Sequence, residues 1–472
     1  MPQGASLRLG FAREGCCFRD AIAFLSFGTQ VTGLIGQRGI LPAATFLRRV
    51  KEVTGGPAWH LVPTIFWFDS SDGFLKLVCF LGVVAAGFVF AGKGWRIALV
   101  FCYLLYLSLV HAGQDFMSYQ WDMLLLESGF LAIFLGWRPF VISMSRWLLF
   151  RLMFLSGVAK LMSGDPTWRN LSALRYHYET QPLPPWTAWF MHQLPASFQT
   201  ASVLFVLFVE LAVPLLIFAP RRLRLFAFGA LVVLQILIAA TGNYAFFNLL
   251  AIVLGVTLLD DGVFPGRWQG RAAGSPARRW PVWVLAPVAV ITFAATSVHL
   301  AGAVRPSLRP PVPLVRLASW LAPFRSTNGY GLFMVMTTSR PEIVVEGSDD
   351  GQTWHAYEFR WKPGDLRRRP RFVAPHQPRL DWQMWFAALS TCEANPWFVN
   401  FLARLLEGSP PVLHLLAKNP FPDRPPRYIR AVLYDYRFTD AANRRATGAW
   451  WRREEKGLYC PVLSRDMLRS AR

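Results

Sequence analysis

The sequence predicts a polytopic α-helical membrane bundle of about nine spans, followed by a β-rich, sandwich-like soluble domain with helical insertions. Hydrophobic residues make up 53% of the 472 residues and charged residues only 16%, whereas about a quarter of a typical soluble protein is charged. Long apolar blocks alternate with short basic loops until residue 303, beyond which charged and aromatic residues are interspersed. We therefore expect a transmembrane domain at 1–303 and a soluble C-terminal domain at 304–472.

The expected spans are apolar runs of about 16 to 21 residues, close to the length that crosses a bilayer. They lie at 19–36, 74–91, 96–112, 121–137, 142–162, 200–219, 223–241, 244–259 and 282–302. No convincing cleavage site follows the first run, so we expect an uncleaved helix there. The distribution of arginine and lysine among the loops places the N-terminus inside, and nine spans then place the C-terminal domain on the exported side.

The segment 37–73 is too long for a turn and too polar for a span. It holds a basic patch at Arg48, Arg49 and Lys51, and an aromatic run at 66–68. This composition predicts a short amphipathic helix lying at the membrane interface.

The net charge is +21, which raises nucleic acid as a possible partner. The arginines are spread over short inter-helix loops and the last third of the chain, not gathered in one basic tract. This distribution argues against nucleic acid, and it favours the anionic head groups of a lipid bilayer.

Beyond the proline-rich linker at 309–313, the pattern changes to that of a β-rich domain. Runs at 333–338, 342–346, 353–359 and 428–438 predict strands, a turn is expected at 348–351, and helices are expected at 396–407 and 409–417. Runs of this kind, interrupted by helical segments, favour a sandwich with helical insertions.

Ionisable and amide side chains inside apolar spans are candidates for pairing or chemistry, because a charge in hydrocarbon costs at least about 2.5 kcal/mol. Lys160 is the best catalytic candidate, as a base acting on a lipophilic substrate, and Glu210 is a second catalytic candidate. If Glu127 or Glu210 lies beside Lys160, the two residues form a structural ion pair instead. Asn243 is expected to cap a helix and Asn248 to hydrogen-bond between helices.

His111, Asp115 and Asp122 would share one face if 111–122 were a single helix. Gly113 argues that it is not. The alternative is a polar loop end just outside the bilayer.

The soluble domain contains one aromatic cluster that is a candidate for binding a client protein. Trp382, Trp385 and Phe386 stand together beside Arg379 and Asp381, and tryptophan is enriched at binding hot spots. The alternative is that these rings form the core of the domain.

Cys392 and Cys460 could form a disulfide if the domain faces an oxidising compartment, and free buried thiols are the alternative. The sequence at 349–351 lacks the ligand spacing of a calcium loop, so we expect a hairpin turn there. We find no metal-ligand pattern, nucleophile elbow or phosphate-binding loop in the sequence, and we expect no cofactor.

Several sequence blocks resemble the lipase maturation factor family. They are YQWDMLLLE at 119–127, SGDPTW at 163–168, YHYETQPLP at 176–184, GNYAFFN at 242–248, NGYGLF at 328–333, EGSDDG at 346–351, PHQPRLDWQMWF at 375–386, NPFP at 419–422 and YIRA at 428–431. The blocks occur in order over nearly the whole chain, which makes the resemblance specific.

The resemblance implies a multi-pass membrane protein, resident in the endoplasmic reticulum of animals, whose C-terminal domain helps secreted lipases to fold and assemble. It favours a non-enzymatic folding factor with an exported client. The arginine- and alanine-rich composition is typical of bacteria, in which case the compartment would be an inner membrane with the domain in the periplasm.

A weaker resemblance links FLSGVAKLMSGDPTWR at 154–169, and the span around Glu210, to the membrane part of vitamin K-dependent γ-carboxylase and its bacterial relatives. In that family a lysine placed like Lys160 acts as a base. This resemblance supports the alternative function, a membrane enzyme acting on a lipophilic substrate.

Overall fold

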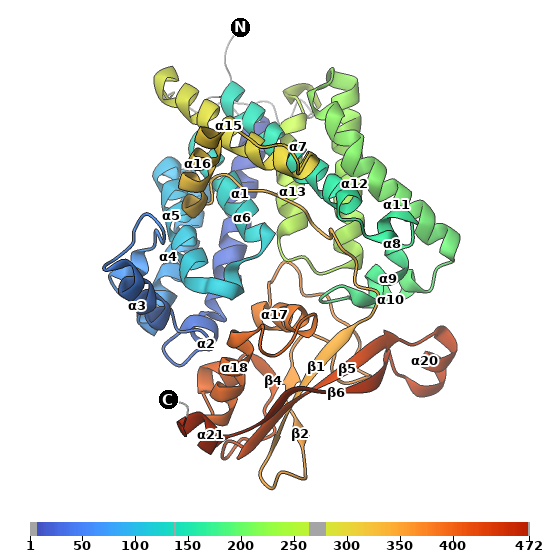
Figure 1. Cartoon of the computed structure of the whole chain (residues 1–472). Coiled ribbons are helices and arrows are strands. Elements are labelled where there is room, and N and C mark those ends of the chain that lie inside the picture. The colour runs from blue at the N-terminus through green and yellow to red at the C-terminus, as the bar shows by residue number, and fades with distance from the viewer. Residues whose placement is uncertain (1–6, 136–137, 264–279, 471–472) are drawn as a thin grey trace.

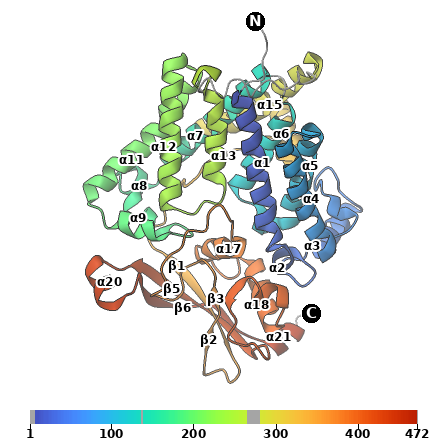
Figure 2. The ribbon, with the colours of Figure 1, turned by 180° about the vertical axis from the view of Figure 1, so that it is seen from behind.

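The computed structural model describes residues 7–135, 138–263 and 280–470. Helices of the first two thirds form an upright bundle, and the last third forms a mixed domain beneath one end of it (Figure 1). Figure 2 shows from behind that α17 (Arg379–Ala388) lies between the bundle and the sheet of this domain.

Six helical segments are long and apolar enough to cross a membrane. They are α4 (Asp72–Ala91), α5 (Trp95–Gly113) with η2 (Gln114–Met117), α7 (Arg138–Met162), α11 (Ala196–Leu211) with η3 (Val213–Phe218), α12 (Arg221–Thr241) and α15 (Val282–Val304). Each coincides with an expected span. Large apolar side chains such as Phe208, Ile236 and Val290 are exposed on these helices, as expected where lipid replaces water.

The other three expected spans are not confirmed. The 19–36 run is divided between α1 (Leu7–Gly28) and α2 (Val31–Ile35), while 121–137 and 244–259 contain α6 (Gln120–Ile133), α13 (Phe247–Gly255) and η4 (Val256–Leu258). At about 1.5 Å per residue, α6 and α13 are too short to cross about 30 Å of hydrocarbon. Most of their residues are buried in the bundle, so protein packing explains their apolar sequences.

Short helices connect the long ones. Within 37–73, α3 (Ala43–Thr54) is amphipathic and mostly exposed, and η1 (Ile65–Trp67) follows it. Three helices join α7 to α11: α8 (Pro166–Arg169), α9 (Ala173–Thr180) and α10 (Trp186–His192). The remaining ones before the sheet are η5 (Asp261–Val263), α16 (Val312–Leu321) and η7 (Ala322–Phe324).

The C-terminal domain is built on one antiparallel sheet in the order β2-β1-β5-β6. Its strands are β1 (Pro341–Ser348), β2 (His355–Ala356), β5 (Tyr428–Phe438) and β6 (Trp451–Ser464). A small second ladder joins β3 (Glu358–Phe359) to β4 (Leu416–Lys418), and α18 (Pro396–Leu406), α19 (Pro410–Leu413), α20 (Ala441–Thr447) and α21 (Arg465–Ser470) complete the domain. The expected sandwich is not confirmed, because helices rather than a second large sheet pack against this one.

The strand predictions at 342–346 and 428–438 and the helix prediction at 396–407 are confirmed by β1, β5 and α18. The prediction of a strand at 333–338 is wrong, because this segment is irregular in the structure and lies against the turn and the short helix α8 that follow α7. There, the Met336 backbone N–H donates to Asp165 and the Trp168 indole donates to the Phe333 carbonyl.

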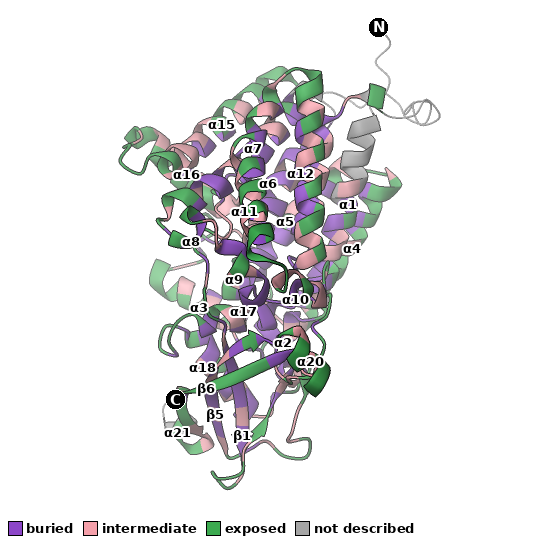
Figure 3. Cartoon of the chain, turned by 90° about the vertical axis from the view of Figure 1, so that its right-hand side faces the viewer, coloured by how far each residue is buried: buried purple, intermediate pink, exposed green. Residues whose placement is uncertain are grey.

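The two parts of the chain share one core. The largest cluster of buried apolar side chains runs from α1 and α5 through α17 to α18 and β1, and Figure 3 shows buried ribbon continuing from the bundle into the domain. Phe116 after α5 packs against Trp397 of α18 with 5.6 Å between ring centroids. The C-terminal domain is therefore packed against the membrane helices rather than tethered to them.

Candidate functional site

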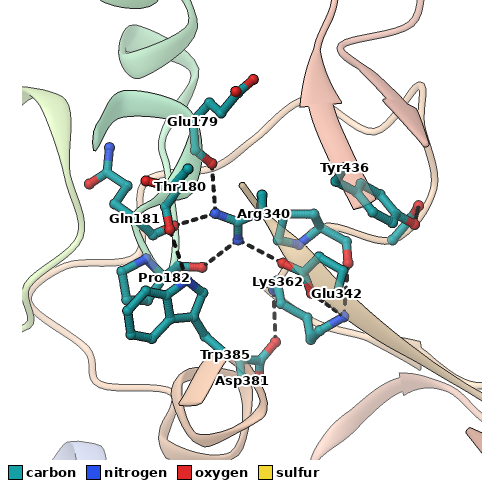
Figure 4. Close-up of polar contacts among 12 residues, drawn as sticks. Glu179, Thr180, Gln181, Pro182, Arg340, Glu342, Lys362, Asp381, Trp385 and Tyr436 are labelled. Carbon is teal, nitrogen blue, oxygen red and sulfur yellow. Dashed lines mark hydrogen bonds and ion pairs between the residues drawn. The ribbon is translucent and has the colours of Figure 1, made fainter. Parts of the chain in front are cut away.

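A buried polar junction holds the C-terminal domain to the loop after α9 (Figure 4). Arg340, directly before β1, is 1% exposed. Its guanidinium donates to the backbone carbonyls of Glu179 and Pro182, each at 2.8 Å, and to that of Gln181. It also donates to Glu342 Oε1 at 2.7 Å. One side chain thus satisfies three carbonyls of a proline-rich turn that is distant in sequence.

The junction continues through a second buried cation. Lys362 Nζ lies 2.8 Å from Glu342 Oε2, so this carboxylate is shared between two cations. The backbone N–H groups of Trp361 and Lys362 donate to Asp381 Oδ1 at 2.8 and 2.9 Å. Burial raises the pKa of Asp381, although these two hydrogen bonds oppose the shift. Each of the four charged side chains thus has at least one partner within the junction, which indicates a rigid joint.

Asp122 and Arg379 form a second fully buried ion pair, between α6 and α17. Arg379 Nη1 and Nη2 lie 2.8 Å from the two oxygens of Asp122, and Tyr106 donates to the same carboxylate at 2.5 Å. Trp382 packs edge-on against Trp121, with 4.7 Å between ring centroids. Bidentate geometry and packing fix α17 on the bundle.

This arrangement changes the interpretation of the expected client-binding cluster. Arg379, Asp381 and Trp382 are 0%, 3% and 3% exposed, so they belong to the core, as the alternative from the sequence states. The indole of Trp385 donates to the Thr180 carbonyl at 2.8 Å. Phe386, which is 42% exposed, remains available to a partner.

A third buried ion pair anchors the segment that precedes β1. Arg151 of α7 donates to Glu127 of α6 and, at 2.9 Å, to the Asn328 carbonyl. Tyr330 donates to the other oxygen of Glu127 at 2.7 Å. Glu127 therefore pairs with Arg151 rather than with Lys160.

Lys160 pairs with Glu210 of α11, with 2.7 Å between Nζ and Oε2. Its ammonium also donates to the carbonyls of Leu332 at 3.0 Å and Ser156 at 3.3 Å. This geometry meets the condition stated above for a structural ion pair, and all three N–H donors have acceptors. A role as a base would require breaking this pair.

Whether Lys160 and Glu210 form a structural ion pair can be tested by substitution. We expect Glu210→Gln to lower stability by about 3 to 5 kcal/mol, because it leaves Lys160 buried and unpaired. Lys160→Met combined with Glu210→Gln should recover most of the loss. Thermal unfolding of the purified variants measures this, and a double variant no more stable than Glu210→Gln would contradict a structural pair.

Two family models and several relatives match the chain over most of its length. A model of the lipase maturation factor transmembrane domain matches residues 11–266, and one of the lipase maturation factor C-terminal domain matches residues 326–461. The chain is 39% identical to lipase maturation factor 2 of Gallus gallus, over 94% of this chain and 79% of the relative. It is 37% identical to lipase maturation factor 1 of Bos taurus, over 95% of this chain and 87% of the relative.

The chain belongs to the lipase maturation factor family. It is also 35% identical to lipase maturation factor 2 of Homo sapiens, over 94% of this chain and 80% of the relative. No solved structure matches the chain. The family resemblance is thus confirmed, and together with the six apolar helices it identifies a multi-pass membrane protein.

Two asparagines of the family-like block at 242–248 have defined partners. Asn243 donates to the carbonyls of Leu183 and Arg371 and accepts from the N–H groups of Val373 and Ala374, so it joins two loops rather than capping a helix. Asn248 of α13 donates to Gln235 of α12 at 2.8 Å. The latter bond is the interhelical contact expected from the sequence.

His111, Asp115 and Asp122 do not share one helix, because α5 ends at Gly113 and α6 begins at Gln120. His111 forms a hydrogen bond with the Pro323 carbonyl at 2.7 Å, while Asp122 forms a buried ion pair with Arg379. The three residues therefore form no common site.

The acidic run at 349–351 is a turn closed by its own carboxylate. Asp350 accepts from the backbone N–H groups of Gln352 and Thr353 at 2.8 and 2.7 Å, and these bonds hold its pKa below the usual range. Gly351 has φ of +76°, which a side chain would strain. No metal-binding group of three or more ligands occurs among the residues that the structure describes.

Cys392 and Cys460 are joined by a disulfide with 5.5 Å between their Cα atoms and a sequence separation of 68. Closing a loop of this length stabilises a fold by about 4 kcal/mol in the chain-entropy model. We expect Cys392→Ser with Cys460→Ser to lower the thermal midpoint, and a reductant to lower that of the wild type only. If the reductant left the thermal midpoint of the wild type unchanged under unfolding conditions, the disulfide would not contribute this stability.

Three residues of the polar junction carry no strong sequence signal: Arg340, Glu342 and Lys362. The useful signal is the apolar run at 343–345, which directly follows the charged residues Arg340 and Glu342. A strand buried on both faces cannot leave an adjacent carboxylate unpaired. The sequence does not show that the carbonyl partners of Arg340 lie at 179–182.

Proposed function

We propose that this chain is a membrane-anchored maturation factor that helps a secreted lipase, or another exported protein, to fold. The observation that supports this best is the match to lipase maturation factors over both parts of the chain. The membrane helices anchor the protein and the C-terminal domain holds the client. We place it in the endoplasmic reticulum membrane or, in a bacterium, in the inner membrane with the domain in the periplasm.

The buried ion pairs support a holding role rather than catalysis. Lys160, Glu127 and Arg340 each have close partners. The cations of these pairs also donate to backbone carbonyls across the junction, from Arg151 and Lys160 to 328 and 332 and from Arg340 to 179–182. The surface of α17 offers an apolar face to a client, because Phe386 and Leu389 are 42% and 41% exposed and lie three residues apart.

The test is the yield of active lipase secreted by cells that lack their own maturation factor. We expect the full chain to restore activity and Phe386→Ser with Leu389→Ser to reduce it several-fold at equal expression. Leu458→Ser with Val462→Ser, an exposed apolar pair on β6 of the same domain, controls for loss of apolar surface. Lipase activity that does not depend on the full chain would overturn the proposal.

A further inference from the structure

An arginine–aromatic surface lies where α20 meets α10. It consists of Arg369, Arg444, Trp186, Phe190 and Phe372, which lie around the buried Trp450. The Arg444 guanidinium carbon lies 3.7 Å from the Trp450 ring centroid, and that of Arg369 lies 4.6 Å from Trp186 and 6.0 Å from Trp450. The Trp186 ring contacts both Phe190 and Phe372. Residues of three separate segments, 186–190, 369–372 and 444–450, thus lie together.

The two arginines of this surface form no ion pair with a carboxylate of residues 7–135, 138–263 or 280–470. The buried arginines at 151, 340 and 379, in contrast, each pair with one. The closest acidic residue in sequence to Arg444, Asp440, uses its carboxylate to cap α20 at the Asn443 N–H. Two positive charges therefore share one indole and remain open to an anion.

The surface lies level with the ends of membrane-capable helices. Thr187 of α10 donates to the Ala240 carbonyl at 2.6 Å, one residue before α12 ends. The helix α11 begins at Ala196, four residues after α10. Figure 1 shows α10 at the lower ends of α11 and α12, and α20 below α10. Lipid head groups occupy this level of a membrane protein, where tryptophan is enriched and long arginine side chains near helix ends reach the head groups.

The composition of the surface matches both parts of a lipid head-group region. Phe190 and Phe372 are 47% and 41% exposed, and such rings lie at the boundary between head groups and acyl chains. The planar guanidinium of arginine matches phosphate, which it can bind with two hydrogen bonds. A soluble anion would use the charges but not the exposed rings.

We propose that the arginine–aromatic surface binds the phosphate of an anionic phospholipid head group. The bound lipid would hold the C-terminal domain against the bilayer beside α10, on the side of the molecule opposite α18. This inference stands on the contacts above and does not depend on the proposed role in lipase maturation.

The test uses the full chain purified in an uncharged detergent and titrated with phosphatidylglycerol or phosphatidylcholine, with bound lipid counted by native mass spectrometry. We expect a preference for phosphatidylglycerol. Arg369→Gln with Arg444→Gln should weaken its binding about 25-fold, because each arginine contributes about a fivefold factor. Replacement of both by lysine should retain a preference, because the charge is kept.

The matched control is Arg424→Gln with Arg427→Gln. It removes the same charge at the opposite end of β5, roughly 30 Å away, and should bind lipid as the wild type does. Equal affinity for the two lipids would overturn the proposal, as would wild-type binding by the Arg369→Gln, Arg444→Gln variant. Displacement of phosphatidylglycerol by inorganic phosphate or an acidic peptide at equal concentration would assign the surface to soluble anions and also overturn it.

Discussion

Arg340→Met should lower the stability of the whole molecule by about 3 to 5 kcal/mol, the usual cost of removing one partner from a buried ion pair. The substitution leaves three carbonyls of 179–182 without their donor. It also leaves the Glu342 carboxylate with Lys362 alone. Because Arg340 connects the sheet to the bundle, we expect the C-terminal domain to loosen from the helices. Thermal unfolding and hydrogen exchange at 179–182 measure the two effects.

Arg340→Lys separates charge from geometry. A lysine keeps the positive charge near Glu342 but cannot present the forked donors that reach several carbonyls at once. We expect it to recover only part of the loss. Arg437→Met is the control, because Arg437 is 45% exposed and pairs with Asp435 at the surface, where ion pairs contribute at most about 1 kcal/mol. Similar losses for Arg340→Met and Arg437→Met would contradict a structural role for the junction.

The lipid-exposed part of the fold could be predicted from the sequence, because lipid requires an apolar surface over a fixed length. All six membrane-capable helices coincide with expected spans. The helices α6 and α13 are apolar for another reason: they are surrounded by protein. Composition does not distinguish these two environments, and only helix length separates them. This accounts for two of the three expected spans that are not confirmed; the third, 19–36, is divided between α1 and α2.

In the C-terminal domain, a strand could be predicted where its residues alternate between the core and the surface. The strand β5, whose burial alternates along its length, is the example. The strand β6 was missed because it is an edge strand with charges at 452–456 and a proline at 461. Such residues protect a sheet edge from further pairing, and they also remove the apolar alternation that identifies a strand. The small β3–β4 ladder has too few residues to show any period.

Only part of the candidate site could likewise be predicted from the sequence. The sequence shows which charges stand in apolar surroundings, so Lys160, Glu127 and Glu210 were identified as candidates. It does not show how they are paired, because the partners are distant in sequence: 24 residues separate Glu127 from Arg151, and 257 separate Asp122 from Arg379. Pairing decides whether a buried charge is reactive or structural.

The Asp122–Arg379 pair provides the second large effect. Asp122→Asn keeps the shape of the side chain but removes the charge that neutralises Arg379, which is fully buried. We expect a loss of about 3 to 5 kcal/mol. Arg379→Met should cause a loss of similar size, because it leaves the carboxylate with Tyr106 as its remaining close donor.

The double variant distinguishes a pair from two independent residues. If the cost of each single change is the exposure of an unpaired buried charge, Asp122→Asn with Arg379→Met removes both charges and should be more stable than the sum of the two losses predicts, by several kcal/mol. Thermal unfolding of the four proteins gives this coupling. Additive losses would mean that α17 is held by the packing of Trp382 on Trp121, and that the ion pair contributes little to the position of the C-terminal domain.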